Sequence, residues 1–446
     1  MFRLETTGVC SIKIEEWGEG MEGGMKTVSM LCGRKRRGKE TVIIMCLLLI
    51  IMNGCGRQRA EDAPADGGRE KIVLWSYYET EAQHDALDEL VQSFNLEQDR
   101  YEASWEYVPM TDFTKKLTMA YTEQALPDLA LIDNPDMPVC IKMGMFEDIT
   151  EFLEELQVKE EYYPDLLQTV TADGRMYGIP AVCNNVALIY NRKYLKEAGI
   201  EPPRNREELR DAAKKLTTEG RDGFLMCGID GQQGAFQILP WILSTGEPAD
   251  RLGGEGTEEA LAFLYGLMED GCMTHNCINL SQTDVARVFL NGEAAMMENG
   301  PWIFPMLEAA GMDYGVSPLP TGETGTVIAG GENFGILKGK NREGAELFLE
   351  YYNEDAVMRK FCEKTCSLPA KTGVRMRDQS KMQVIEEQMK GAVVRSRIPS
   401  WNRMSEELTE VFYRMTVGEI SPEQAAASLR TEGNNGPENS PPTLND

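Results

Sequence analysis

The fold is decided by the stretch KIVLWSYYETEAQHDALDELVQSFNLEQDRYEASWEYV, residues 71–108. Its first five residues are mostly apolar and include β-forming side chains, so they predict a buried strand. Four apolar residues then recur at the spacing of one helical face: Leu87, Leu90, Val91 and Phe94. Residues 101–108 alternate as a second strand. A strand, a helix and a strand in this order favour a parallel sheet.

The alternation of strands and helices continues along the chain. The next predicted helix carries the apolar residues Phe113, Leu117, Ala120 and Tyr121. Further strands are predicted at 128–132 and 186–190, and further helices at 205–216, 257–268, 283–290, 404–415 and from Ser421. The sequence therefore predicts an α/β protein without internal repeats.

Length and composition exclude several classes of protein. The 446 residues are 42% hydrophobic and 26% charged, as in a globular protein of two or three domains, or of two lobes. The formal net charge is -27, from 45 basic and 72 acidic residues, and such a surface repels nucleic acid. Only two histidines are present, which disfavours Ser/His catalysis and His-rich metal sites.

The N-terminal region has the pattern of an export signal. A basic segment, RKRRGK at 34–39, precedes an apolar run at 42–52 and then Asn53-Gly54-Cys55. The apolar run is too short to span a bilayer of about 30 Å. We expect a leader at 1–54, with the true start at Met25 or Met30, a flexible tether at 55–70 and a disordered tail at 431–446.

The end of the apolar run resembles the lipobox of bacterial lipoproteins, in which the cysteine is lipidated. This resemblance implies a lipid on Cys55 and a protein anchored on the outer face of the cell membrane. Elsewhere Cys272, His275 and Cys277 lie within six residues, but no fourth ligand accompanies them. No metal or other cofactor is expected.

Four further segments, in order along the chain, resemble family 1 extracellular solute-binding proteins, the maltose-binding-protein-like receptors of ABC importers. The first is Asp173-Gly-Arg-Met-Tyr-Gly-Ile-Pro180 with Leu188-Ile-Tyr-Asn191 and Ala198-Gly-Ile-Glu-Pro-Pro203. The second runs from Phe289 to Met297 and on to Gly300-Pro-Trp302. The third is Tyr314 to Pro320 with Gly330-Gly331, and the fourth is Leu368-Pro-Ala370.

The resemblance implies a two-lobed, type II periplasmic-binding-protein-like fold, with mostly parallel sheets flanked by helices and a hinge between the lobes. It places lobe 1 at 71–182 and 319–368, and lobe 2 at 184–317 and 370–430. The hinge candidates are 181–184, 316–318 and the region of Ala370. It also implies a monomeric binding protein, not an enzyme, that closes on a sugar and presents it to the permease subunits of an ABC transporter.

Sugars present apolar faces and hydroxyl rims, so their sites combine aromatic plates with carboxylates and amides. By resemblance, Trp302 is the main candidate for a stacking plate, with Trp401, Phe236 and Trp241 as further candidates. Each of these four has a place in the core as its alternative.

Polar candidates are expected on lobe 1, because ligands of open α/β sheets lie at the carboxyl ends of strands. Some follow predicted strands, some lie at the crossing between the lobes, and some follow the Gly330-Gly331 turn. They are Tyr77, Glu79, Asp133, Asn134, Asn184, Asn185, Glu332 and Asn333. No Arg or Lys is among them, which disfavours an anionic ligand.

Two alternatives remain open at this point. The same fold could bind a polyamine or a peptide, since acidic residues and tryptophans also suit a cation. A more distant alternative is a secreted glycoside hydrolase, which requires a pair of carboxylates that no motif here singles out.

Overall fold

In the part of the chain that the structure describes, each lobe is built around one main β-sheet. The computed structural model describes residues 68–321, 326–339, 341–377, 380–395, 398 and 400–432. The predicted leader, Cys55 and the tail beyond residue 432 lie outside these residues. Within the described part of the chain, no helix has the length and apolarity that crossing a bilayer requires.

The sheet of the first lobe has five strands in the order β2-β1-β3-β12-β6. Their bounds are β1 Glu70–Ser76, β2 Tyr101–Tyr107, β3 Leu129–Asp133, β6 Gly178–Pro180 and β12 Glu332–Ile336. The strands predicted at 71–75, 101–108 and 128–132 are confirmed, and β1 pairs in parallel with both β2 and β3. β12 is antiparallel to β3 and to β6, because the chain enters it on its way back from the second lobe.

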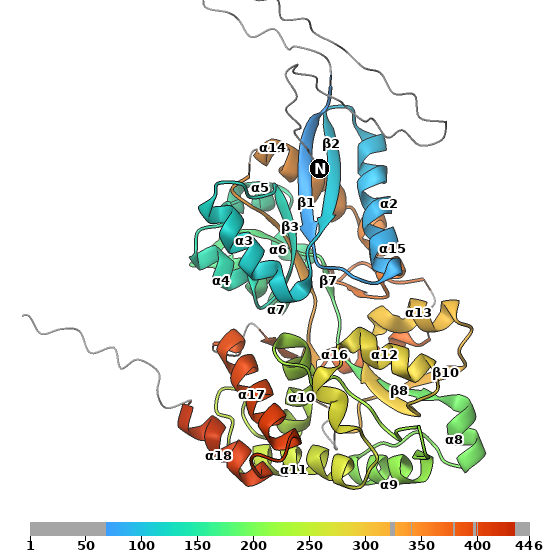
Figure 1. Ribbon diagram of the computed structural model, residues 1–446. Helices are drawn as coiled ribbons and strands as arrows, with labels where there is room; N and C mark the ends of the chain where they lie inside the picture. Colours follow the sequence, from blue (N-terminus) through green and yellow to red (C-terminus); the bar gives the residue numbers. More distant parts are fainter. Residues whose placement is uncertain are drawn as a thin grey trace, which may run out of the picture. The chain divides into compact units, whose positions relative to one another are not determined.

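Helices flank this sheet, and α2 and α15 lie side by side next to it (Figure 1). The helices are α2 Glu81–Glu97, α3 Phe113–Thr122, α4 Met137–Lys142, α5 Thr150–Glu155, α6 Val158–Glu161, α7 Pro164–Leu167, α14 Arg342–Asn353 and α15 Asp355–Thr365. All four apolar residues predicted on α2 are buried. The helix predicted from Phe113, Leu117, Ala120 and Tyr121 is confirmed as α3, on which Tyr121 is 37% exposed.

The sheet of the second lobe has the strand order β10-β8-β9, with β8 Ala187–Asn191, β9 Met296–Asn299 and β10 Tyr314–Ser317. Both pairings are antiparallel, so the expected mostly parallel sheet is wrong for this lobe.

Nine helices of the described chain surround the second sheet, and α10, α11, α17 and α18 pack against one another (Figure 1). The nine are α8 Arg192–Ala198, α9 Arg206–Leu216, α10 Gln232–Leu243, α11 Glu255–Glu269, α12 Gln282–Leu290, α13 Phe304–Ala309, α16 Met382–Met389, α17 Trp401–Thr416 and α18 Pro422–Glu432. The predicted cap of α9 is confirmed, since the Asn205 side chain accepts a hydrogen bond from the backbone N–H of Glu208.

Short paired segments connect the two sheets. β7, Val182–Cys183, pairs with β13, Leu368–Pro369, and β11, Ile328–Ala329, pairs with β14, Val393–Val394. β7 follows the first-lobe strand β6 and precedes the second-lobe strand β8, so the chain passes between the lobes there. The remaining short strands, β4 Thr171–Ala172 and β5 Arg175–Met176, form a hairpin.

Candidate functional site

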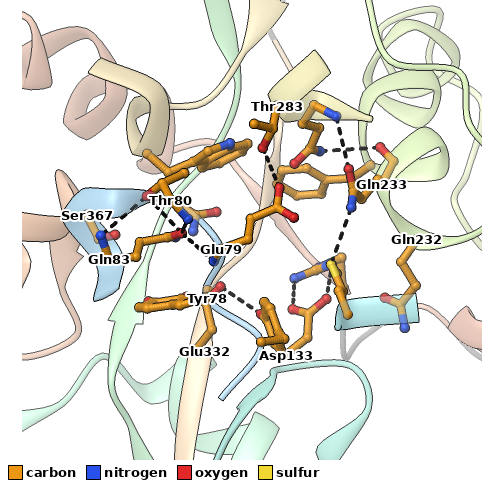
Figure 2. Close-up of a pocket in the computed structure, with 18 residues that line it drawn as sticks. Tyr78, Glu79, Thr80, Gln83, Asp133, Gln232, Gln233, Thr283, Glu332 and Ser367 are labelled. Carbon is orange, nitrogen blue, oxygen red and sulfur yellow. Dashed lines mark hydrogen bonds and ion pairs between the residues drawn. The ribbon is translucent and has the colours of Figure 1, made fainter. Parts of the chain in front are cut away.

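A pocket opens between the two lobes where the strands of the first sheet end. The first lobe contributes Tyr77, Tyr78, Glu79, Thr80, Gln83, Met110, Asp133 and Glu332 to its lining. The second lobe contributes Gln232, Gln233, Phe236, Gln282, Thr283 and Trp302, and the connecting segments contribute Asn184, Gly331, Ser367 and Arg395. Figure 2 shows these side chains converging from both sides.

Glu332 forms the floor of the pocket on the first-lobe side. It is 8% exposed and accepts hydrogen bonds from the hydroxyls of Tyr77 at 2.8 Å and Tyr78 at 3.1 Å. It lies directly opposite Asp133 in the pairing of β12 with β3. Burial, together with the charge of Asp133, raises the pKa of Glu332 to about 7, although the two tyrosine hydroxyls oppose this rise.

Arg395 neutralises Asp133 in a buried ion pair. Its two terminal nitrogens contact the two carboxylate oxygens, one of them at 2.9 Å, and both side chains are about 5% exposed or less. Burial raises the pKa of Asp133, and Arg395 opposes that rise. The guanidinium also lies over the rings of Phe236, at 4.8 Å, and Trp401, at 5.5 Å.

Arg395 corrects the expectation that the site holds no cation. The residue follows β14, a two-residue strand that no hydrophobic period marks in the sequence. Its Nε is buried and has no hydrogen-bond partner in the described structure.

Trp302 is the aromatic side chain that the second lobe presents most openly to the pocket. It is partly buried, and its ring centroid lies 6.4 Å from that of Phe236, at an interplanar angle of 39°. A Cβ on Gly300 would lie 1.9 Å from the Trp302 ring. Glycine at 300 is therefore what lets the ring lie close against its own backbone.

Two hydrogen bonds between lining side chains cross the pocket from lobe to lobe, and one of them runs from Gln233 Nε2 to Met110 Sδ at 3.7 Å. The Thr283 hydroxyl, on α12, donates to the Glu79 carboxylate, which follows β1 in the first lobe (Figure 2). Rotation of the lobes about the connecting segments would break these bonds and expose the pocket. The arrangement can therefore enclose a small polar molecule and release it by opening.

Seven of the twelve side chains predicted for the site line this pocket: Tyr77, Glu79, Asp133, Asn184, Phe236, Trp302 and Glu332. They come from both lobes and from the connection at Asn184. The face of Phe236 toward Arg395 is already covered by the guanidinium.

The other five predicted side chains lie outside the lining. Trp241 is fully buried in the second-lobe core, where its Nε1 donates to Glu298 at 2.8 Å. Trp401 is 4% exposed, lies behind Arg395 and donates to Gln232. Three asparagines are buried in the polar interior beside the sheet and the connecting segments: Asn134, Asn185 and Asn333.

Several lining residues were missed by the sequence reasoning. Gln232 and Gln233 are the first two residues of α10. The sequence could have indicated them, because two consecutive amides precede the apolar part of that helix. Gln282, Thr283 and Ser367 carried no such signal, because single polar residues at helix and strand ends are common. In the described part of the chain, no three His, Cys, Asp or Glu side chains are arranged to hold a metal ion.

Comparisons with known proteins agree with this geometry. A family model described as a bacterial extracellular solute-binding protein matches residues 89–385. The galactooligosaccharide-binding protein of Bacillus subtilis (strain 168) is 21% identical over 414 residues, which cover 88% of this chain and 95% of that protein. The maltooligosaccharide ABC transporter solute-binding lipoprotein of Streptococcus pneumoniae (strain R6) is 24% identical over 373 residues, 75% of this chain and 80% of that protein.

Solved structures show the same fold. An ABC transporter solute-binding protein from Thermotoga lettingae TMO, bound with alpha-D-tagatose, matches with a TM-score of 0.75 and 24% identity. The match covers 82% of this chain and 99% of that chain.

Proposed function

The chain belongs to the bacterial extracellular solute-binding proteins, and from this premise we propose that it captures a mono- or oligosaccharide between its lobes and delivers it to an ABC permease. The single observation that carries the proposal is the composition of the interlobe pocket. An aromatic plate, Trp302, faces carboxylates and amides contributed by both lobes. Relatives whose names specify galactooligosaccharides and maltooligosaccharides support the same ligand class.

The pocket side chains have complementary roles toward a sugar. Trp302 would stack on the apolar face of a sugar ring, as aromatic side chains do with C–H surfaces. Glu79 and Glu332 would accept hydrogen bonds from hydroxyls, and the amide of Asn184 would both donate and accept.

Closure is the step that couples capture to delivery. A ligand that touches both walls binds the closed arrangement better than the open one, so it shifts the population toward closure. The closed lobes would then present a combined surface to the permease. The family consists of binding proteins, and we propose that this chain likewise catalyses no reaction.

The proposal extends to the placement of the protein in the cell. We assign residues 71–182 with 319–368 to lobe 1, and residues 184–317 with 370–430 to lobe 2. A lipid on Cys55 would tether these lobes, as a monomer, to the outer face of the membrane through residues 55–70. Incorporation of labelled palmitate into the wild type but not into Cys55→Ser would test the anchor.

A polyamine is the second candidate ligand, and one observation favours it. The pocket lining holds the three carboxylates Glu79, Asp133 and Glu332 against the single guanidinium of Arg395, which already pairs with Asp133. A protonated amine would neutralise the remaining negative charge. The sugar is preferred because the relatives named for galactooligosaccharides and maltooligosaccharides match most of this chain.

A thermal-shift screen tests the proposal. The purified protein is melted with mono- and oligosaccharides, polyamines and short peptides. A ligand at about 100 times its dissociation constant adds about 2.7 kcal/mol to stability. We expect a saccharide to raise the melting temperature of the wild type and of Tyr413→Ala, a matched change at an exposed aromatic, but to act weakly on Trp302→Ala. A shift with polyamines alone would refute the sugar assignment.

A further inference from the structure

Asp136 joins the lobes at a point outside the ligand pocket. It follows β3 in the first lobe and does not line the pocket around Trp302. Its Oδ1 accepts hydrogen bonds from two second-lobe amides, Gln232 Nε2 on α10 at 2.6 Å and Asn402 Nδ2 on α17 at 3.0 Å. Its Oδ2 accepts from the first-lobe Thr114 hydroxyl at 3.4 Å. Opening the lobes would break both interlobe bonds. Because Asp136 does not line the pocket, its effect on closure is separate from ligand contact.

The two amides differ in how firmly they are oriented. The Gln232 Oε1 accepts a hydrogen bond from Trp401 Nε1 at 2.8 Å, so its Nε2 must face Asp136 as a donor. The Asn402 Oδ1 is buried and has no partner in the described structure. Asn402 can therefore turn its amide and offer Asp136 either an N–H donor or a carbonyl acceptor.

This asymmetry suits a carboxyl group that exists in two protonation states. A carboxylate accepts from both amides, whereas a carboxylic acid accepts from Gln232 and donates its O–H to Asn402 Oδ1. In the second state the orphaned carbonyl oxygen gains a partner, which removes the penalty of a buried unsatisfied acceptor.

The charges around Asp136 favour proton uptake on closure. Burial and the neighbouring Asp133 raise the pKa of Asp136 to about 6, against the opposing effects of Gln232, Arg395 and Asn402. The other titratable groups facing it are Cys140 on α4, Asp230 before α10 and Glu406 on α17, and none of these is a cation. Lobe opening exposes Asp136 to water and returns its pKa toward about 4.

We propose that Asp136 is a proton-sensitive latch between the lobes, held by Gln232 and Asn402, so that the closed arrangement takes up a proton that the open one releases. Asp136 is a positioning residue, because it acts on closure and not on the ligand. The inference rests on closure as proposed above, but it does not require the ligand to be a sugar.

The size of the linkage follows from the two pKa values. With a pKa of about 6 in the closed form and about 4 in the open form, lowering the pH from 8 to 5 favours closure about tenfold. The direction of the effect follows from the same values: the closed form has the higher pKa, so its population rises as the pH falls. Glu332 also has a raised pKa, so its titration can add its own pH dependence. All the variants compared below keep Glu332, so this contribution is the same in each.

Small-angle X-ray scattering of the ligand-free protein at pH 8 and pH 5 tests the latch. The wild type is expected to have a smaller radius of gyration at pH 5 than at pH 8. Asp136→Asn removes the negative charge while keeping the size of the side chain, so it resembles the neutral, protonated state and should have the smaller radius at both pH values. Asp136→Ala loses both bonds and should have the larger radius at both.

Control variants separate the latch from general damage. Asp148→Asn changes a first-lobe aspartate whose side-chain partners, Thr150 and Arg175, lie in the same lobe, and it should behave as the wild type. Asn402→Ala keeps the buried carboxylate but removes a hydrogen bond that lowers its pKa, so its pH response should persist with a midpoint at higher pH, even if Asp136→Ala fails to fold. The proposal is overturned if the radius of gyration of Asp136→Asn changes between pH 8 and pH 5 as that of the wild type does. It is also overturned if the wild type, Asp136→Asn and Asp136→Ala have the same radius of gyration at each pH. Absence of any saccharide hit would remove the sugar assignment and leave this result unaffected.

Discussion

Replacing Arg395 by methionine is expected to destabilise the protein by about 3 to 5 kcal/mol, the usual cost of breaking a buried ion pair from one side. Methionine keeps the length and apolar stem of the arginine, so packing against Phe236 and Trp401 is largely retained. What is lost is the bidentate contact that neutralises Asp133.

The magnitude follows from the burial of both partners. The Asp133 side chain is 4% exposed, so water cannot replace the guanidinium when Arg395 is removed. Burial already raises the pKa of Asp133, and Arg395 is the main group that opposes the rise. Without it, the folded pKa climbs further above the unfolded value of about 3.9. The loss of stability is therefore small below about pH 4 and grows as the pH rises through the folded pKa.

Urea unfolding followed by circular dichroism at pH 5 and pH 8 provides the assay. Arg395→Met should lose more stability at pH 8 than at pH 5. The double variant Asp133→Asn with Arg395→Met should recover to within about 1 kcal/mol of the wild type, because no unpaired charge remains. An Arg395→Met protein as stable as the wild type at both pH values would refute the reasoning.

Three further predictions concern the pocket. Trp302→Ala should weaken saccharide binding by about 1 to 3 kcal/mol in titration calorimetry, and unchanged affinity in a folded variant would place Trp302 outside the site. Gly300→Ala, whose Cβ would lie 1.9 Å from the Trp302 ring, should displace the ring and lower affinity while far-UV circular dichroism stays that of the wild type; full affinity would contradict the stated contact. Glu332 has a folded pKa of about 7 against an ordinary 4.5, so its contribution to stability is lost between these pH values, by roughly 3 kcal/mol. Glu332→Gln should therefore gain stability relative to the wild type from pH 4 to pH 8 in thermal melts, and a constant difference would disprove the shift.

Local patterns in the sequence predicted much of the first lobe. The strand and helix between Lys71 and Glu97 follow from side-chain periodicity alone, and the structure has both. The direction of β12 could not be predicted in this way. Its five residues are all buried, and nothing within them records whether a neighbouring strand runs parallel or antiparallel.

The pocket was predicted less completely, for reasons visible at particular residues. Phe236 and Trp241 are five positions apart on α10, about 140° around the helix axis at 100° per residue. They cannot both face the pocket, and Trp241 packs into the core. Arg395 and Asp136 act through partners more than 90 residues away in the sequence. Such contacts exist only once the lobes are assembled.

The position of β12 has a consequence for the order in which the protein is made. This strand lies between β3 and β6, yet it is synthesised after all three strands of the second sheet. A nascent chain that ends before Glu332 has four strands of the first sheet but lacks the one that joins β3 to β6. Both strands would present unpaired edges, which invite pairing with other chains.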